Sequence, residues 1–364
     1  MRIAILPGDG IGAEVAAEAK ACLALVSERR GLDLAFSEHD FGGAGIDRAG
    51  TPFPEATLAA CRSADAVLLG AVGGPKWDGA AERPEKGLLA MRAALGLFAN
   101  LRPVRVNEGM EDLSPLKPEI AREADILVVR ELTGGAYFGE KALSDDFASD
   151  TCVYTRAEIE RVAHTAFRAA RSRRCKVTSV DKANVLSTSK LWRRVVEEVA
   201  ADYPDVALDH LYVDAAAMLI VTNPRRFDVI LTENMFGDIL SDELAVLSGS
   251  IGLLGSASNG TGKAALFEPI HGSAPDLAGL DVANPAGAIA SAAMLLDHLE
   301  HFDLARVVEV ALREVLATDC RTADLGGSAR CSEFGAAVRE RISALLDRMD
   351  AIEDLVAMNR GCCG

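Results

Sequence analysis

The sequence lacks any run of about eighteen apolar residues, the length that a membrane-spanning helix needs. Its first eight residues, MRIAILPG, are too soon interrupted by proline and glycine to form the apolar core of a secretory signal. We therefore expect a cytoplasmic protein.

Positive charge is in the minority. The chain has 38 Lys and Arg residues against 54 Asp and Glu residues, and its formal net charge is −16. Such a balance repels polyanions, which argues against nucleic acid or an anionic membrane as the main partner. An anionic small-molecule substrate would have to meet a local basic pocket.

Cysteine pairs with metal-ligand spacing are also lacking, as are internal repeats and low-complexity segments. Scattered thiols of this kind indicate reduced cysteines rather than a disulfide framework. The adjacent Cys362 and Cys363 are expected in a frayed tail, with a redox-active pair as the alternative. The eight cysteines are Cys22, Cys61, Cys152, Cys175, Cys320, Cys331, Cys362 and Cys363.

What the sequence does contain is an alternation of short β-rich runs and amphipathic helical stretches. At 364 residues, 49% of them hydrophobic, the chain is long enough for two ordered domains. Alternation of this kind predicts an α/β architecture with covered sheets. Strands are predicted at 2–6, 66–69, 126–130, 176–180, 208–213 and 227–231, and helices at 13–29, 156–171 and 188–201.

Two segments depart from the alternation. Residues 131–154 contain several glycines and acidic residues, which predicts either a long loop or an excursion that pairs with another subunit. Residues 249–262 are rich in glycine, and a domain boundary near them would join the two ends of the chain into one domain.

Two aspartates, Asp238 and Asp242, lie one helical turn apart in the otherwise apolar stretch 232–244. Like charges at this spacing repel, and more strongly where apolar neighbours exclude water. Carboxylate oxygens on one helical face suit Mg²⁺ or Mn²⁺. The pattern therefore indicates a divalent-cation site, with a solvated acidic face as the alternative.

Polar residues follow neighbouring predicted strands. Asp181, Lys182 and Asn184 come after one strand, and Asp214 comes after the next. In α/β proteins, ligands bind at the carboxyl ends of strands. The alternatives are that Asp214 only caps a helix and that Lys182 only pairs with Asp181.

Three arginines, Arg92, Arg102 and Arg130, supply the complementary charge. Arg130 ends the apolar run ILVV, where a guanidinium group is unfavourable without an anion. Guanidinium groups hold carboxylates through two parallel hydrogen bonds. Together with a cation, the arginines predict a site for a small, multiply charged acid. The alternative is that each arginine only forms a salt bridge within the protein.

The segment GDGIGA at 8–13 fits the dinucleotide-binding pattern G-x-G-x-x-A, with Glu38 and Asp40 further on. Alone this pattern is a weak signal, and we do not assign NAD to it.

Six motifs follow one another along nearly the whole chain. They are LPGDGIG at 6–12, ANLRP at 99–103, RELTGGAYFGE at 130–140, VDKANVL at 180–186, NMFGDILSDE at 234–243 and EPIHGSAPD at 268–276. Together they resemble the β-decarboxylating dehydrogenases, the isocitrate/isopropylmalate dehydrogenase family.

The resemblance implies a two-domain α/β fold with a mixed sheet flanked by helices, and not a Rossmann fold. A cofactor-binding domain would comprise residues 1–98 and 250–364. Residues 99–249 would form the substrate, metal and dimerisation domain, with an arm at about 139–154. In the family this arm pairs with its counterpart in a homodimer.

The resemblance also implies roles for residues. Tyr137 and Lys182 match the proton-transfer pair, Asp214, Asp238 and Asp242 the ligands of Mg²⁺ or Mn²⁺, and Arg92, Arg102 and Arg130 the residues that hold the malate carboxylates. Asp214 also lines the substrate site. The two active sites would be shared, with Lys182 and Asp214 completing the site of the other subunit.

For the cofactor, the resemblance implies NAD on the later loop rather than at the first glycine turn, which is then only a tight turn. A carboxylate at Asp276 would accept hydrogen bonds from the ribose hydroxyls and repel a 2′-phosphate, so NAD is expected rather than NADP. The matching residues are His271, Gly272, Ser273, Ala274, Pro275, Asp276, Leu277 and Asn284.

Substrate choice is expected to depend on Glu85, Leu88 and Leu89. Isocitrate-using relatives carry a small polar pair where this chain has the two leucines, which here would form an apolar cup for an isopropyl group, unless they are ordinary helix core. The implied reaction is oxidative decarboxylation of (2R,3S)-3-isopropylmalate to 4-methyl-2-oxopentanoate, in leucine biosynthesis.

Three other functions are the alternatives. A tartrate, D-malate or homoisocitrate dehydrogenase would share the family frame. A metal-dependent lyase without redox chemistry would lack the adenosine loop, and 271–276 argues against it. A catalytically silent binding protein would lack Lys182 or Tyr137, and both are present.

Overall fold

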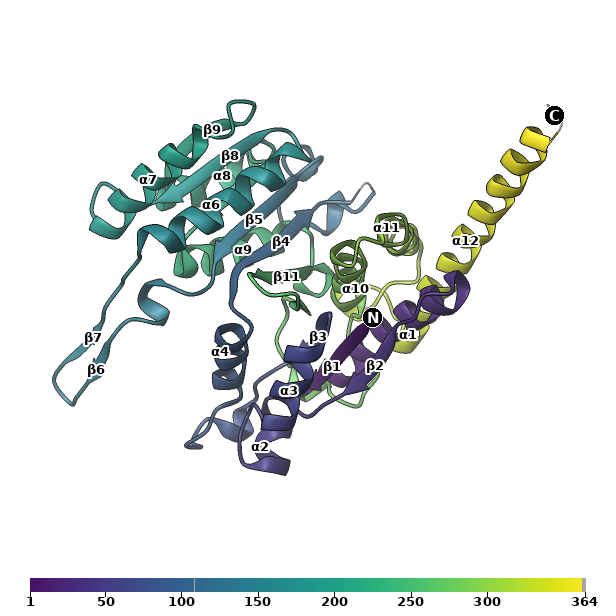
Figure 1. Ribbon diagram of the computed structural model, residues 1–364, viewed down its shortest axis with the longest axis horizontal. Helices are drawn as coiled ribbons and strands as arrows, with labels where there is room; N and C mark the ends of the chain where they lie inside the picture. Colours follow the sequence, from purple (N-terminus) through teal and green to yellow (C-terminus); the bar gives the residue numbers. More distant parts are fainter. Residues whose placement is uncertain (108, 362–364) are drawn as a thin grey trace. The chain divides into compact units, whose positions relative to one another are not determined.

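The computed structural model describes residues 1–107 and 109–361, and the chain forms two compact units. Unit 1 comprises Met1–Leu88 and Phe267–Gly364, and unit 2 comprises Leu89–Leu266 (Figure 1). The divisions fall inside helix α4 (Pro84–Ala94) and strand β12 (Ala265–Pro269). The functional domains proposed from the sequence, with limits at 98/99 and 249/250, stay a prediction.

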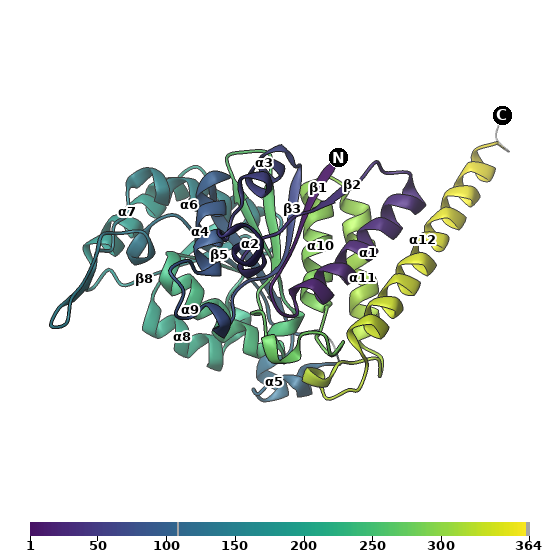
Figure 2. The ribbon, with the colours of Figure 1, turned by 90° about the horizontal axis from the view of Figure 1, so that it is seen from below.

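In unit 1 the strand order is β2-β1-β3-β12, and β1 is parallel to both β2 and β3. The apolar run of β1 is fully buried, as expected for a parallel strand covered on both faces. Helices α1, α10, α11 and α12 pack together (Figure 2). The elements are β1 (Arg2–Gly8), α1 (Gly12–Arg30), β2 (Ala35–Glu38), α2 (Gly43–Ala49), α3 (Glu55–Ser63), β3 (Ala66–Ala71), α10 (Ala286–His298), α11 (Phe302–Leu316) and α12 (Cys331–Gly361).

In unit 2 the strand order is β11-β4-β5-β10-β8-β9. Strand β4 is antiparallel to β11 and β5, whereas β5, β10, β8 and β9 are parallel, so the predicted mixed sheet is confirmed. Helices α6 and α7 lie on one face and α8 and α9 on the other (Figure 2). The elements are β4 (Leu97–Arg105), α5 (Pro118–Ala121), β5 (Asp125–Glu131), α6 (Arg156–Arg171), β8 (Lys176–Asp181), α7 (Ser187–Ala200), β9 (Ala207–Tyr212), α8 (Val213–Thr222), β10 (Val229–Thr232), α9 (Asn234–Leu247) and β11 (Gly255–Gly260).

Every helix and strand that the sequence predicted is present, with ends that differ by a few residues at most. The predicted excursion is a hairpin of β6 (Lys141–Leu143) and β7 (Ala148–Asp150), whose residues are all exposed. It extends away from the rest of unit 2 (Figure 1).

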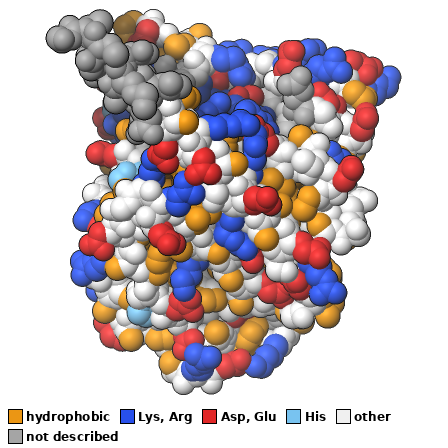
Figure 3. Space-filling model, turned by 90° about the vertical axis from the view of Figure 1, so that its right-hand side faces the viewer, with side chains coloured by type: hydrophobic (Ala, Val, Ile, Leu, Met, Phe, Trp, Pro, Cys, Tyr) orange, Lys and Arg blue, Asp and Glu red, His pale blue; other side chains and the backbone are white. Residues whose placement is uncertain are grey.

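The surface carries charges of both signs. On the face drawn in Figure 3, basic and acidic side chains are interspersed. Ion pairs join charged side chains of different helices, as between Arg29 of α1 and Asp347 of α12, at 2.5 Å.

Among the described residues, no helix is long and apolar enough to cross a bilayer. The six cysteines within that part of the chain are all free thiols, as predicted. Cys362 and Cys363 lie outside the described residues, so the expectation of a frayed tail is not tested.

Candidate active site

Helix α9 carries both aspartates of the predicted cation site. The side chain of Glu233 caps the helix by accepting a hydrogen bond from the backbone N–H of Phe236, 2.7 Å away. One turn separates Asp238 from Asp242, and their side chains are 34% and 60% exposed. The carboxylates are therefore accessible to a ligand, but they are not simply solvated, because arginines contact both.

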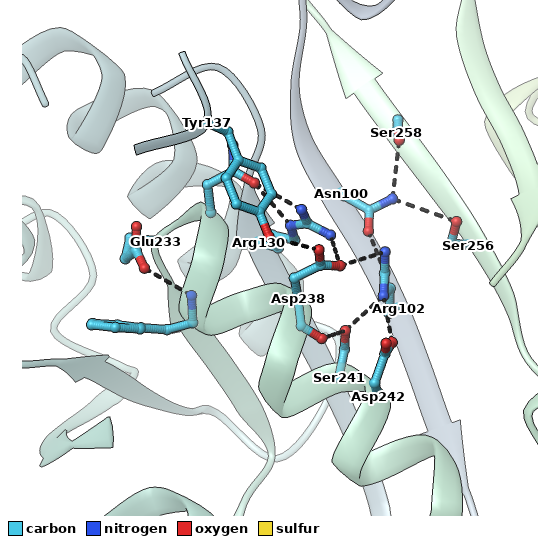
Figure 4. A network of polar contacts seen from close by, with 12 residues as sticks. Asn100, Arg102, Arg130, Tyr137, Glu233, Asp238, Ser241, Asp242, Ser256 and Ser258 are labelled. Atoms are coloured by element: carbon cyan, nitrogen blue, oxygen red, sulfur yellow. Dashed lines mark hydrogen bonds and ion pairs between the residues drawn. The ribbon is translucent and has the colours of Figure 1, made fainter. Parts of the chain in front are cut away.

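Arg102 of β4 lies between the two carboxylates. Its Nη1 lies 3.2 Å from Asp242 Oδ1 and its Nη2 lies 3.5 Å from Asp238 Oδ1. The same Nη1 donates to Ser241 Oγ at 2.7 Å, and Nε donates to Asn100 Oδ1 at 2.7 Å. These contacts fix the plane of the guanidinium group (Figure 4).

Arg130, at the end of β5, is 2% exposed and pairs with Asp238 from the other side (Figure 4). The pKa of Arg130 is lowered to about 10, chiefly by burial and also by the positive charges of Arg102 and Arg92, whereas Asp238 opposes the shift. The other two predicted arginines thus lie close enough to Arg130 to repel it. Such a concentration of positive charge in a desolvated place favours an anion.

Gly237 of α9 makes room for this arrangement. A Cβ atom there would lie 2.7 Å from Cγ and 2.8 Å from Cβ of Arg130. Because carbon atoms do not approach so closely, any other residue would displace either α9 or the arginine. The glycine in the NMFGDILSDE motif thus has a packing reason.

Tyr137 lies in the short turn Gly135–Tyr137, and its hydroxyl donates to Asp238 Oδ2 at 3.1 Å. Its ring is 5.9 Å from the Arg130 guanidinium carbon. Burial raises the pKa of Tyr137, and the negative charge of Asp238 raises it further. The hydroxyl therefore keeps its proton and can act as an acid.

Lys182 follows β8 and pairs with Asp214 in the first turn of α8, not with Asp181. Asp181 instead binds Arg193 through two hydrogen bonds of 2.9 Å. The hydrogen bond from the Lys182 ammonium group lowers the pKa of the Asp214 carboxyl. Within the residues that the structure describes, no three His, Cys, Asp or Glu side chains lie close enough to hold a metal.

Asp214 is thus not brought to Asp238 and Asp242 within one chain. The set of three metal ligands and the site shared between two subunits stay predictions.

Side chains that the sequence analysis did not single out complete the site. Asn234 Oδ1 accepts hydrogen bonds from Arg130 Nε and Nη2, at 3.1 and 2.8 Å. Asn100 Oδ1 accepts one hydrogen bond from Arg102, from Nε, and the Asn100 amide nitrogen donates to Ser258 Oγ at 3.0 Å. Both asparagines stand in the family motifs, which was the available signal.

Helix α4 carries the residues expected to select the substrate. Leu89 is 36% exposed, Leu88 is half-buried and Glu85 is exposed. The alternative that both leucines are ordinary helix core is therefore wrong for Leu89. Arg92 lies one turn further along the same helix and is 9% exposed.

In unit 1, the loop predicted to hold the cofactor has an irregular backbone. Ala274 has a positive φ of 36° before the turn Pro275–Leu277, and Asp276 is exposed. Nε2 of His271 is buried and has no hydrogen-bond partner in the described part of the chain. Burial lowers the pKa of His271, so the ring is neutral and offers that nitrogen to a ligand.

Asn284, the last residue of the predicted cofactor set, is 6% exposed. Its amide group donates to Asp324 Oδ2 at 2.9 Å and accepts from the backbone N–H of Ala286 at 3.0 Å, at the start of α10. The asparagine thus joins the loop to two other segments of unit 1.

The first glycine turn is a tight turn, as inferred. A Cβ atom at Gly8 would lie 1.9 Å from the carbonyl oxygen of Ala71, and one at Gly10 would lie 1.9 Å from that of Ser273. The buried Asp9 carboxylate accepts from the backbone N–H groups of Gly43, Ala44 and Gly73. Protein backbone thus occupies the space beside these glycines.

Comparison with known proteins defines the class. The family model described as isocitrate/isopropylmalate dehydrogenase matches residues 2–338, and the chain belongs to this family. Among solved structures, an isocitrate dehydrogenase from Methylococcus capsulatus superposes with a TM-score of 0.84 at 38% identity, covering 94% of this chain and 99% of that one.

Relatives of known name narrow the comparison. A 3-isopropylmalate dehydrogenase from Listeria innocua is 52% identical over 94% of this chain and 98% of its own length. One from Bacillus thuringiensis is 54% identical over 94% of this chain and 96% of its own.

Proposed function

We propose that this protein catalyses the NAD-dependent oxidative decarboxylation of (2R,3S)-3-isopropylmalate to 4-methyl-2-oxopentanoate, a step of leucine biosynthesis. The observation that carries the proposal is identity of 52% or more, over nearly the whole length, to proteins named for this activity. The cytoplasmic location stays a prediction from the sequence.

The arginines account for binding of the malate part of the substrate. Arg102 and Arg130 now contact the carboxylates of Asp238 and Asp242, and a substrate carboxylate offers the same two oxygens. Arg92 adds a third positive charge. Leu88 and the exposed Leu89, on the same helix as Arg92, are the residues proposed to contact the isopropyl group.

Asp238 and Asp242, with Asp214 of a second subunit, would hold Mg²⁺ or Mn²⁺. The fit is supported by hard oxygen donors one turn apart on one face of α9. When bound, the cation lowers the pKa of the substrate hydroxyl and stabilises the charge that develops on its oxygen, while NAD accepts the hydride.

The chain's own residues move the protons. Lys182, again from the second subunit, takes the proton of the C2 hydroxyl, directly or through one water. Tyr137 keeps its hydroxyl protonated because its pKa is raised by burial and by Asp238. It would give that proton to C3 of the enolate that remains after carbon dioxide has left.

NAD is proposed to bind unit 1 along residues 271–284. The support is the buried, unpartnered Nε2 of His271 and the exposed carboxylate of Asp276. A carboxylate at this place accepts from ribose hydroxyls and repels the 2′-phosphate of NADP.

The direct test follows reduced nicotinamide by absorbance with purified protein, Mg²⁺, NAD and one acid at a time. We expect reduction with 3-isopropylmalate and much less with isocitrate, D-malate, tartrate or homoisocitrate. A preference for one of these other acids would show that the protein has a different activity within the family. Asp238→Asn and Asp242→Asn should weaken Mn²⁺ binding in a titration, and unchanged binding would refute the metal assignment.

A further inference from the structure

Tyr154 is the last residue of the arm, between the hairpin of β6 and β7 and helix α6, and is 7% exposed. Its ring packs edge-on against Trp192, with ring centres 5.7 Å apart. Its hydroxyl donates to Glu233 Oε2 at 3.0 Å and accepts from the backbone N–H of Asn234 at 2.9 Å. A single hydroxyl group thus connects the capping residue of α9 with the first residue of that helix.

Hydrogen bonds continue from there to the substrate arginine. Asn234, 1% exposed, accepts from two nitrogens of Arg130 and donates through Nδ2 to the carbonyl oxygen of Gly134 at 3.2 Å. Arg130 in turn pairs with Asp238. The orientation of the guanidinium group therefore depends on where the first turn of α9 lies.

The ring of Tyr154 also supports the turn that carries Tyr137. A Cβ atom at Gly134 would lie 2.5 Å from Cε1 of the ring, and one at Gly135 would lie 2.6 Å from the hydroxyl oxygen. The backbone of this turn therefore lies directly on Tyr154.

We propose that Tyr154 is a positioning residue for the reaction: its hydroxyl fixes the first turn of α9, and through Asn234 it sets the orientation of Arg130 toward the substrate carboxylate. The inference rests on the proposed function. Without the hydroxyl, the buried N–H of Asn234 loses its acceptor and Glu233 loses a donor, so the turn must shift or admit water. The ring contacts would remain.

The test compares Tyr154→Phe with Tyr203→Phe. Tyr203 is also 7% exposed, belongs to the same hydrophobic cluster and makes one side-chain hydrogen bond, to His164 Nδ1 at 3.0 Å. Since small displacements of a positioning group are costly, we expect Tyr154→Phe to raise KM for 3-isopropylmalate about tenfold. KM for NAD should not change, and Tyr203→Phe should change neither constant.

A double-mutant cycle tests whether the effect passes through Arg130. In an Arg130→Lys background, the two guanidinium nitrogens that donate to Asn234 are gone. Adding Tyr154→Phe to that variant should therefore lower kcat/KM by less than about twofold. Asn234→Leu removes the acceptor at the next link and should raise the same KM. It serves as the second variant if Tyr154→Phe does not fold.

The outcomes distinguish a failure of this inference from a failure of the proposed function. The inference alone is overturned if wild type reduces NAD and folded Tyr154→Phe has the wild-type KM for 3-isopropylmalate. The same result for Asn234→Leu overturns it if Tyr154→Phe does not fold. Equal losses in Tyr154→Phe and Tyr203→Phe, or full additivity with Arg130→Lys, also overturn it. No NAD reduction by wild type with any acid of the family overturns the proposed function and, with it, this inference.

Discussion

At the scale of single residues, the exposed carboxylate of Asp276 is proposed to choose the cofactor. Asp276→Lys replaces a charge that repels a 2′-phosphate with one that attracts it, so the preference for NAD over NADP should narrow. The measurement is the ratio of kcat/KM for the two cofactors. Asp303→Lys, an equal charge change at an exposed residue of α11, is the control.

If Asp276→Lys and Asp303→Lys both keep the wild-type ratio of kcat/KM for NAD and NADP, the adenosine ribose does not lie beside Asp276.

Residue types at the site could be predicted, but their partners could not. Asp238, Asp242, Arg102 and Arg130 were singled out from charge and spacing alone, and the structure brings all four together. The arginines lie on strands and the aspartates on a helix, and these elements become neighbours only through tertiary packing. The sequence therefore does not show which carboxylate each arginine contacts. The same holds for Lys182, whose partner is Asp214 at the start of helix α8, one helix and one strand further along the chain.

At the scale of elements, the turn between β1 and α1 supports the proposed cofactor loop. Ile11 N–H donates to the carbonyl oxygen of Ser273 at 2.8 Å, and Gly10 has no room for a side chain beside that oxygen. Gly10→Ala should therefore displace the loop and raise the Kd for NAD, measured by nicotinamide fluorescence or calorimetry.

Gly31→Ala is the matched control. Gly31 has a φ of +63°, close to the +57° of Gly10, but a Cβ atom there would meet nothing within 4 Å. Both variants should lose about 1–2 kcal/mol of stability from left-handed backbone strain. Equal Kd values for NAD in the two would show that the turn does not support the loop.

Helix α4 carries the two leucines, Leu88 and Leu89, that are proposed to contact the isopropyl group of the substrate. Changing Leu88 to Ser and Leu89 to Asn removes the apolar surface proposed for the isopropyl group, whose burial contributes about 1.5–3 kcal/mol. The double variant should lose more than about tenfold in kcat/KM for 3-isopropylmalate, and far less for unsubstituted malate. Equal losses on both substrates would show that the leucines act only through the stability of the helix.

Elements with a strong apolar period were predictable, and those without one were not. Strand β11 has the sequence GSASNG, which reads as a loop, yet it pairs with β4. Its small hydroxyl side chains Ser256 and Ser258 lie beside Asn100, the residue that orients Arg102 (Figure 4). A long-range pairing of this kind leaves no local pattern in the sequence.

At the scale of the whole molecule, the proposed active site takes residues from two chains. Within one chain, Lys182 pairs with Asp214, and the described residues hold no set of three metal ligands. The proposed homodimer, with the arm of β6 and β7 pairing with its counterpart, would supply Lys182 and Asp214 to the site of the other subunit.

Complementation tests this arrangement. When Lys182→Ala and Asp238→Asn chains are unfolded and refolded together, half the dimers are mixed, and each has one site with both defects and one with neither. About a quarter of wild-type activity should therefore return from two inactive parents. If mass measurements confirm heterodimers and no activity returns, each site is built from a single chain.

The proposed reaction couples oxidation and decarboxylation of one branched substrate on this protein. Reduced nicotinamide, followed by absorbance, and released carbon dioxide can be measured in the same reaction, with 3-isopropylmalate, NAD and Mg²⁺. We expect one carbon dioxide for each NADH and 4-methyl-2-oxopentanoate as the product. Carbon dioxide or another product formed without NADH, or NADH formed without carbon dioxide, would contradict it.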